Sequence, residues 1–448
     1  MQERMQPIEK RTDLPEQLLE QALAAGAQAA EVYQSSSLEN PVIFEGNRLK
    51  QIETTQAEGV ALRLWRKGRP GLAVGYGPIE PQILVEKALA ISDLNEPETP
   101  RLAEGGQRDF GAVGKSMPVE VLVEKGRDAI ARIRDRFPEA ICEASLSCDV
   151  EQVRLITSTG LDYRSQDTTL SGYIDAALTS PDDFLSVGDG AVSRDQLTMT
   201  TAVESIIQRL TWADNTVEPI SGQVPVIFTA GAAGILWSTL RAALNAKRVK
   251  EGTSPWADRW RDGVVSSDSS VISELITLRQ DPTIGPYSCP FDDEGLLTQP
   301  LTLIKNGLIQ SWFSDLASGS STTDTADRRS TGNGIRPGLG SYPTPGLINL
   351  IVTPGSLGWD ELISQQPEAI VVDQMMGEGG DITGDLAINL ELGYLVRKGE
   401  IMGRVKDAMV TGNTYTALNE LIAMGNDSDW AGSTYTPSVV VGSLSVTG

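Results

Sequence analysis

The stretch VPVIFTAGAAGILWSTLRAAL, Val224–Leu244, carries a strand signal that runs directly into a helix signal. An apolar run rich in β-branched residues ends at Thr229, small residues follow, and a helical pattern of apolar positions extends from Ile235 to Val249. Many enzymes hold a nucleophile, a phosphate loop or a metal-binding pair at such a junction. Here the residues from Thr229 to Gly234 offer no acid, base or metal ligand. The fold signal is strong, and the chemical signal is missing.

The chain of 448 residues contains no histidine, the commonest metal ligand and the side chain whose ordinary pKa lies nearest neutrality. Its absence excludes Ser-His-Asp and Cys-His arrangements and every histidine-ligated zinc site. Cys142, Cys148 and Cys289 lack metal or disulfide spacing, so we interpret them as reduced, buried thiols. Cys289 also lacks the histidine that would make it a nucleophile. Chemistry would have to come from carboxylates, lysine, cysteine or a partner subunit.

The net charge and the distribution of apolar residues limit the kinds of partner and the cellular compartment that we expect. The net charge is −23, from 37 basic and 60 acidic residues, and such a chain repels phosphate backbones. No apolar run approaches the ~18 residues that a spanning helix needs, and the polar N-terminal stretch MQERMQPIEKRTD does not resemble a secretory signal. We therefore expect a cytoplasmic protein with no direct nucleic-acid partner and no membrane contact.

The pattern along the chain predicts an α+β protein of two domains, with a boundary in the polar stretch before residue 216. Residues 1–215 predict an N-terminal antiparallel sheet with helices, and residues 216–448 predict a C-terminal β-rich sandwich or barrel-like domain. Amphipathic patterns indicate helices at Pro81–Ser92 and Val119–Phe137. Hairpin signals lie around Arg66–Gly68, Asn306–Gly307 and Lys398–Gly399.

Two further features interrupt the strands of the second half. The stretch SLGWDELISQQ predicts a helix with Ser356 as its cap. The segment Ser318–Gly346 is rich in Ser, Thr, Asp and Gly and is too long for an ordinary connection. We interpret it as a mobile or functional loop.

Carboxylates form two groups beside glycines, with Asp292, Asp293 and Glu294 in one and Asp381 and Asp385 in the other. Two carboxylates could act as acid and base or hold a hard cation. Neither group has the ligand spacing of an EF-hand loop, and aspartates beside glycines commonly bond turn amides. Turn roles are therefore favoured, and an independent carboxylate-based hydrolase stays open as an alternative.

The order of several motifs resembles the TldD/PmbA family, also called modulator of DNA gyrase proteins. They are STGLDYRSQDT, the strand–helix corner at Thr229, FDDEGLLTQPLTLIKNGLIQSWF, STGNGIRP, GDITGD, RKGEIMGRVKDAMVTGN and GSTYTPSVVVG, and together they span nearly the whole chain. The resemblance implies a two-domain subunit of a cytosolic proteolytic complex. In that complex a TldD-type metalloprotease chain pairs with a PmbA-type (TldE) chain.

Catalytic chains of this family carry His-Glu-x-x-x-His at the same corner and a cysteine in a Gly-Ser-Cys context near the C-terminus. Laid on this sequence, the two histidines fall at Thr229 and Gly234, the glutamate at Ala230 and the cysteine at Thr434. Threonine hydroxyls are poor zinc ligands, and alanine and glycine offer none. The resemblance thus implies no catalytic, cofactor-binding or metal residue in this chain, and it places zinc in a TldD-type partner.

The expected function is that of a non-catalytic PmbA/TldE-type subunit in a complex that degrades or matures unfolded peptides. Peptidase activity would require the TldD-type subunit, and peptides would bind by main-chain strand addition. A homodimer is a further expected assembly. A carboxylate-based hydrolase and a non-enzymatic regulatory or scaffold protein remain the alternatives.

Overall fold

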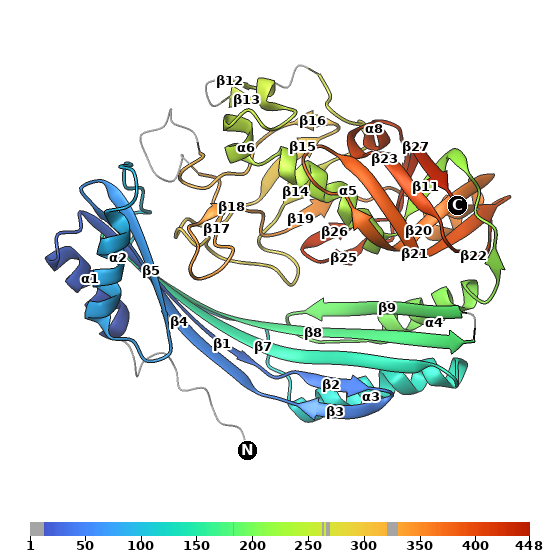
Figure 1. Cartoon of the computed structure of the whole chain (residues 1–448), viewed down its shortest axis with the longest axis horizontal. Coiled ribbons are helices and arrows are strands. Elements are labelled where there is room, and N and C mark those ends of the chain that lie inside the picture. The colour runs from blue at the N-terminus through green and yellow to red at the C-terminus, as the bar shows by residue number, and fades with distance from the viewer. Residues whose placement is uncertain (1–12, 182, 262–263, 266–268, 320–329) are drawn as a thin grey trace.

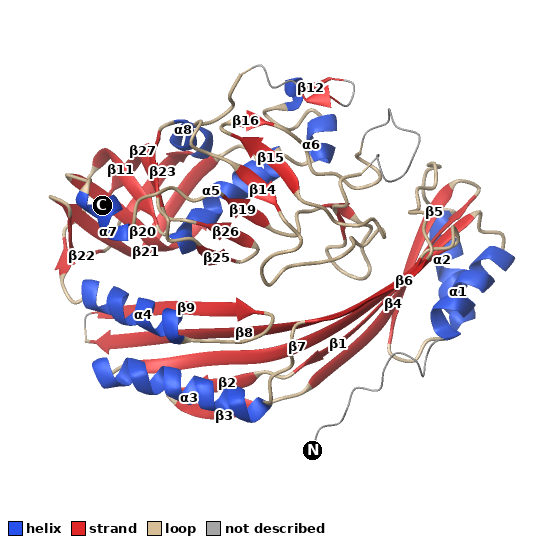
Figure 2. Ribbon diagram, turned by 180° about the vertical axis from the view of Figure 1, so that it is seen from behind, coloured by secondary structure: helices blue, strands red, loops and turns tan. Residues whose placement is uncertain are grey.

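The computed structural model describes residues 13–181, 183–261, 264–265, 269–319 and 330–448. A long, curved N-terminal sheet lies below a C-terminal half built mostly from strands (Figure 1). Helices cover parts of both halves (Figure 2). This arrangement confirms the predicted α+β class. No helix among these residues combines the length and the apolar character that crossing a membrane requires.

The N-terminal sheet has nine strands, joined in the order β3-β2-β7-β1-β4-β5, with β8 beside β7 and both β6 and β9 beside β8. The strands are β1 (Ala29–Glu39), β2 (Val42–Glu45), β3 (Arg48–Ile52), β4 (Thr55–Arg66), β5 (Arg69–Tyr76), β6 (Gln107–Val113), β7 (Ile141–Thr157), β8 (Asp162–Ser180) and β9 (Asp183–Ser193). The sheet is antiparallel as predicted, except that β6 and β8 run parallel. A helix and β7 separate these two strands in the chain, which provides the crossover that a parallel pair needs.

Four helices accompany this sheet: α1 (Asp13–Ala24), α2 (Pro81–Ser92), α3 (Val119–Arg136) and α4 (Thr200–Trp212). The first two pack together on β4 and β5 at one end, and α3 and α4 cover the other end (Figure 2). Cys142 and Cys148 are buried in the core beneath α3, as predicted for structural thiols. The same core continues into the C-terminal half, where Trp212 stacks on Trp359 and contacts the ring of Tyr394.

The C-terminal half contains a barrel-like sheet. Its strands are β10 (Thr216–Val217), β11 (Gly222–Phe228), β20 (Glu368–Glu378), β21 (Asp385–Arg397), β22 (Glu400–Val405), β23 (Met409–Asn413), β24 (Leu421–Met424) and β27 (Val439–Thr447). Strand β23 pairs with both β27 and β21, so the ring β21-β20-β11-β27-β23 closes on itself. Closure removes free edges from this ring, which confirms the predicted barrel-like character.

A second, six-stranded sheet lies beside the barrel in the order β16-β15-β14-β19-β26-β25. Its strands are β14 (Leu278–Gln280), β15 (Leu301–Lys305), β16 (Leu308–Ile309), β19 (Leu350–Val352), β25 (Asp429–Ala431) and β26 (Thr434–Thr436). Two small hairpins, β12 (Trp260–Arg261) with β13 (Val264–Val265) and β17 (Gly334–Ile335) with β18 (Thr344–Pro345), and the short helices α6 (Ala246–Lys250), η2 (Ala257–Arg259), α7 (Trp359–Ser364) and α8 (Thr414–Asn419) complete the half. Helix α5 (Ala230–Ala243) contacts β11 and β20 of the barrel and β25 and β26 of the second sheet.

The three predicted hairpins form at Lys67–Gly68, Asn306–Gly307 and Lys398–Gly399. The φ angles of these six residues run from 49° to 79°. Positive φ at both central residues is the signature of the tight turn whose twist matches antiparallel strands. These local signals therefore set the strand registers on either side.

The helix predicted over Ile235–Val249 is in fact two helices. Helix α5 begins earlier, at Ala230, and ends at Ala243. The side-chain oxygen of Asn245 then accepts the backbone N–H groups of Lys247 and Arg248 and starts α6. A capping asparagine satisfies orphan amides at a helix start, and this is why the helical pattern breaks there.

The predicted cap Ser356 is also wrong. Helix α7 is capped at Gly358, whose backbone N–H donates to Glu361 Oε2 at 2.8 Å. A carboxylate that reaches back to the cap replaces the missing hydroxyl.

Part of the predicted loop Ser318–Gly346 lies outside the described residues, at positions 320–329. The part that is described contains the β17–β18 hairpin and places Asn333 and Arg336 in buried positions. This portion is therefore packed into the molecule and contributes to its interior.

Two buried guanidinium groups join the halves. Arg336 of the C-terminal half pairs with Glu31 of β1, which also binds Arg63 of β4 at 2.8 Å. At the far end of the interface, Arg209 of α4 binds Asp373 of β20 at 3.0 Å. The boundary predicted at residues 215 and 216 falls between α4 and β10.

Candidate functional site

The β11–α5 corner, Thr229–Gly234, has the strand-to-helix geometry that its sequence indicates. Thr229 is the N-cap of α5, and its Oγ1 accepts the backbone N–H of Ala232 at 3.3 Å. The N–H of Thr229 donates to Val372 O on β20 at 3.1 Å. The only hydroxyl of the corner therefore serves the local fold.

The structure brings two of the four positions named in the sequence close together. A Cβ placed on Gly234 would lie 3.6 Å from the Cβ of Ala431 on β25. Ala431 is the cross-strand partner of Thr434 on β26, and paired residues of antiparallel strands project from the same face. Positions 234 and 434 thus face one spot, while Thr229 and Ala230 open the helix beside it.

Hydrogen bonds and packing fix this corner. Trp237 Nε1 donates to Thr436 Oγ1 at 2.6 Å, and the guanidinium of Arg241 donates to Ser433 Oγ at 2.9 Å. Trp237 is fully buried, and burial lowers the pKa of Arg241. Neither of these two bonds involves a carboxylate or a thiol.

The residues at positions 229, 230, 234 and 434 do not fit a zinc ion. Two threonine hydroxyls, an alanine methyl and a glycine provide no imidazole, thiolate or carboxylate ligand. Across the described ranges, no group of three or more His, Cys, Asp or Glu residues has an arrangement that could hold a metal.

The group at Asp292 builds a buried turn. Oδ1 of Asp292 accepts the amides of Glu294 at 3.1 Å and Leu296 at 2.9 Å, and Oδ2 accepts that of Gly334 at 2.8 Å. Burial raises the pKa of Asp292 to about 7 and, together with the charge of Asp292, raises that of Glu294 well above its usual range. Three backbone amides favour the charged form of Asp292, against the one amide of Leu316 that bonds Glu294, so we expect the proton of this pair on Glu294.

The second carboxylate group lies on the surface. Asp381 Oδ1 accepts the N–H and Oγ1–H of Thr383, and these bonds lower the pKa of Asp381. Asp385 Oδ1 accepts from the side-chain amide of Asn413 at 3.2 Å. Asp292 and Asp381 thus have the turn-type bonding that the sequence favoured, whereas Asp385 bonds a side-chain amide. This geometry does not support a carboxylate-based hydrolase.

Cys289 is held as a neutral thiol. Its Sγ donates to Phe291 O at 2.9 Å, and burial raises its pKa to about 12. A thiol with this pKa is not a nucleophile near neutral pH.

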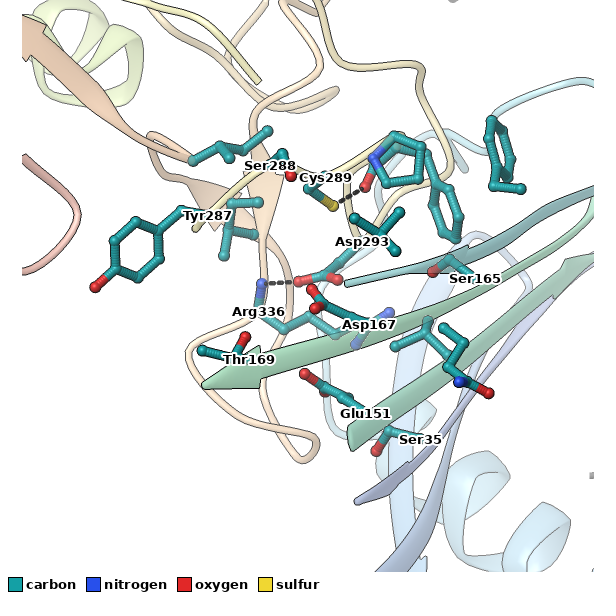
Figure 3. Close-up of a pocket in the computed structure, with 18 of the residues that line it drawn as sticks. Ser35, Glu151, Ser165, Asp167, Thr169, Tyr287, Ser288, Cys289, Asp293 and Arg336 are labelled. Atoms are coloured by element: carbon teal, nitrogen blue, oxygen red, sulfur yellow. Dashed lines mark hydrogen bonds between the residues drawn. The ribbon is translucent and has the colours of Figure 1, made fainter. Parts of the chain in front are cut away.

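Cys289 lies on the wall of a larger cavity, the inter-half pocket, of about 520 Å³ (Figure 3). Strands β1, β6, β7 and β8 form one wall, and the loop 286–291 with residues 335–339 and 347–348 forms the other. The charged residues of the lining are Glu151, Asp167, Arg194, Asp293 and Arg336. The pocket therefore lies between the two halves and is rich in ionisable groups.

Most of these groups already have partners. Asp293 accepts from the Tyr33 hydroxyl at 2.9 Å and from the backbone N–H of Arg336 at 2.7 Å. Arg194 pairs with Asp167 and donates to Ser288 O at 2.9 Å. Burial raises the pKa of Asp293 and lowers that of Arg194.

Sequence reasoning singled out Asp293 and Cys289 but missed Glu151, Asp167 and Arg194. One signal was present, because the turn at Gly160 fixes the register of β7 and β8 and places Glu151 opposite Asp167. The pocket-lining residues of the C-terminal half are separated from these residues by long stretches of chain. They become visible only in the fold.

The profile of the PmbA/TldA metallopeptidase C-terminal domain matches residues 221–448, and that of PmbA/TldA metallopeptidase domain 1 matches residues 30–92. A metalloprotease TldD homolog of Buchnera aphidicola subsp. Schizaphis graminum is 27% identical over 214 residues, 47% of this chain and 42% of that protein. This chain therefore spans under half the length of that relative. A metalloprotease of Methanothermobacter thermautotrophicus is 23% identical over 425 residues, 89% of this chain and 88% of that protein.

Two solved structures share the fold. TldE from Thermococcus kodakarensis superposes with a TM-score of 0.81 at 22% identity, covering 97% of this chain and 99% of that one. A Thermotoga maritima protein described as a modulator of a DNA gyrase also gives a TM-score of 0.81, at 20% identity, with 98% and 100% covered. At these identities the likeness establishes the fold alone.

Proposed function

Because this chain belongs to the PmbA/TldD metallopeptidase family, we propose that it is a non-catalytic, TldE-type subunit of a cytoplasmic peptidase complex. One observation carries the proposal. The four positions that the family resemblance matches to metal and base residues hold Thr229, Ala230 and Gly234 at the β11–α5 corner and Thr434 on β26. The corner retains a strand-to-helix shape, and it lacks the groups that would bind a metal and activate water.

A TldD-type subunit supplies the zinc in this proposal, and this chain contributes structure and contacts for the peptide. Strand β25 supports the role in peptide contact. It is the edge strand of the six-stranded sheet, and no described strand pairs with its outer side. Its Asp429 is close enough to Asp189 of β9 for that charge to raise its pKa, after burial as the main cause. An extended peptide could therefore pair with β25 along its main chain, in the region between the halves.

The test combines metal analysis with a peptidase assay on an unfolded peptide. The purified chain alone is expected to hold no stoichiometric zinc and to leave the peptide intact. A mixture with a TldD-type subunit is expected to co-elute in size-exclusion chromatography and to cleave it. Stoichiometric zinc and cleavage by the chain alone would contradict the proposal, and failure to associate would favour the scaffold alternative.

A variant with restored ligands provides the positive control for metal analysis. Thr229→His, Ala230→Glu, Gly234→His and Thr434→Cys introduced together should make the chain retain zinc, because positions 234 and 434 face one spot. The same variant without Thr434→Cys should retain it more weakly. Equal zinc contents in both variants would show that position 434 does not reach the corner.

A further inference from the structure

Among the residues that the structure describes, one charged group of the inter-half pocket, Glu151, has no hydrogen-bond or ion-pair partner, and the proposed subunit role does not explain it. Arg336 is bound to Glu31 and to Ser341 O, and Arg194 is paired with Asp167. Within the described ranges, no hydrogen bond or ion pair reaches the Glu151 carboxylate. Three carboxylates and two guanidiniums line the cavity, so the net charge of its lining is negative.

Glu151 lies at an energetically unfavourable position on its sheet when the pocket holds no ligand. It lies directly opposite Asp167 in the antiparallel register of β7 and β8, and like charges in such a pair are destabilising. Asp293 approaches from the other half, and Figure 3 shows the three side chains converging on the pocket. Burial, followed by the charge of Asp293, raises the pKa of Glu151, and the charge of Arg194, which is already paired with Asp167, offsets only part of this rise. A cation in the pocket would relieve this repulsion.

The arrangement does not suit a metal ion, since no group of three or more His, Cys, Asp or Glu residues in the described ranges could hold one. The remaining lining instead suits an organic cation with an apolar stem. Phe110 and Phe291 face each other across the pocket with ring centroids 5.2 Å apart, and Tyr287 lies on the same wall as Phe291. Lysine and arginine bury their methylene stems against apolar surface while their charged ends meet polar groups.

An aromatic row connects the pocket to the free edge of β25. The ring centroid of Tyr287 lies 5.5 Å from that of Trp430 on β25, and Trp430 lies 5.1 Å from Tyr435 on β26. The β25–β26 hairpin also carries Ala431 and Thr434 of the corner. A chain that follows β25 would therefore pass the mouth of the pocket on its way to the corner.

We propose that the inter-half pocket receives a lysine or arginine side chain of an extended peptide lying along β25, with Glu151 as its ion-pair partner. The inference rests on the proposed role in peptide handling. It adds a side-chain preference to recognition that otherwise reads only the main chain. The volume of about 520 Å³ lies within the range of small-ligand pockets.

The experiment measures binding of short, labelled, unstructured peptides to the full chain without a partner subunit. One peptide carries a single central lysine, and its match carries norleucine at that position. The lysine peptide is expected to bind about tenfold more tightly, as a partly desolvated ion pair predicts. Glu151→Gln should abolish this preference, and Glu143→Gln, an exposed acid of the same strand outside the pocket, should preserve it.

Equal binding of the two peptides by the unsubstituted chain, or binding of neither, would overturn the proposal. Competition by free 1,5-diaminopentane at concentrations equal to the peptide would also overturn it, because the occupant would then be a small amine. The metal and peptidase measurements judge the subunit role separately. A negative result here therefore leaves that role to its own test.

Discussion

The β11–α5 corner and the inter-half pocket are connected by one aromatic row, yet they differ in how they are held together. At the corner, Trp237 packs in the core, and both Trp237 and the guanidinium of Arg241 donate to neutral hydroxyls. Around the pocket, Glu31, Arg63 and Arg336 are buried ions that stabilise the contact between the halves. The corner depends on shape and the pocket depends on charge, so substitutions should separate the two regions.

The largest effect is expected at Glu31. Glu31→Gln would leave the buried guanidiniums of Arg63 and Arg336 without their shared carboxylate, and we expect the free energy of unfolding to fall by about 3–5 kcal/mol. Urea unfolding measures the change. The control is Glu368→Gln, which removes an exposed ion pair with Arg397 and should cost at most about 1 kcal/mol. Similar losses in both variants would contradict the dependence on buried charge.

An intermediate effect is expected at the buried turn. Asp292→Asn would turn an amide NH₂ toward backbone donors, so we expect a loss of roughly 2–3 kcal/mol in urea unfolding. Glu294→Gln should be tolerated at neutral pH, since the raised pKa of Glu294 favours its protonated form. The reverse order of the two losses would place the proton on Asp292.

The pH profile sharpens the same comparison. Burial raises the pKa of Glu294 above 4.5, so above that pH the folded chain keeps a proton that the unfolded chain releases. The contribution of Glu294 to stability is complete below that pH and is lost as the pH rises through its raised pKa. Unfolding measured from acid to alkaline pH should therefore show Glu294→Gln gaining stability relative to the unsubstituted chain. A constant difference would contradict the assignment.

The smallest effect is expected at the corner. Gly234→Ala should stabilise the chain by about 0.5–1 kcal/mol, because the new Cβ would meet only Ala431 at 3.6 Å and alanine favours a helix. Thermal unfolding measures the gain. Gly285→Ala is the matched contrast, since its Cβ would lie 2.1 Å from the ring of Trp430 at a positive φ. A loss of stability at both positions would show that the corner has no room for a side chain.

Local signals predicted much of the fold. The hairpins at Asn306–Gly307 and Lys398–Gly399 were predictable because their conformation depends on the turn residues themselves. The break between α5 and α6 was missed because the apolar pattern continues across it, although Asn245, a typical capping residue, is a local signal for it. The cap of α7 was missed because Glu361, rather than Ser356, satisfies the first amide.

The closure of the barrel and the composition of the pocket could not be read in this way. Strand β11 lies between β20 and β27, which follow it at large distances in the chain. The pocket likewise combines Glu151 with Tyr287 and Asp293 from the other half. Such pairings depend on packing of whole layers, which a local pattern of residues does not encode.

The two buried guanidinium links between the halves also limit the size of a molecule that can enter the inter-half pocket. Arg336 fastens one end of the interface and Arg209 fastens the other, so moving the walls apart would break an ion pair in a dry environment. A space of about 520 Å³ between fixed walls is far too small for a globular guest. The pocket should therefore admit a side chain or a short extended segment of a peptide and exclude a folded protein.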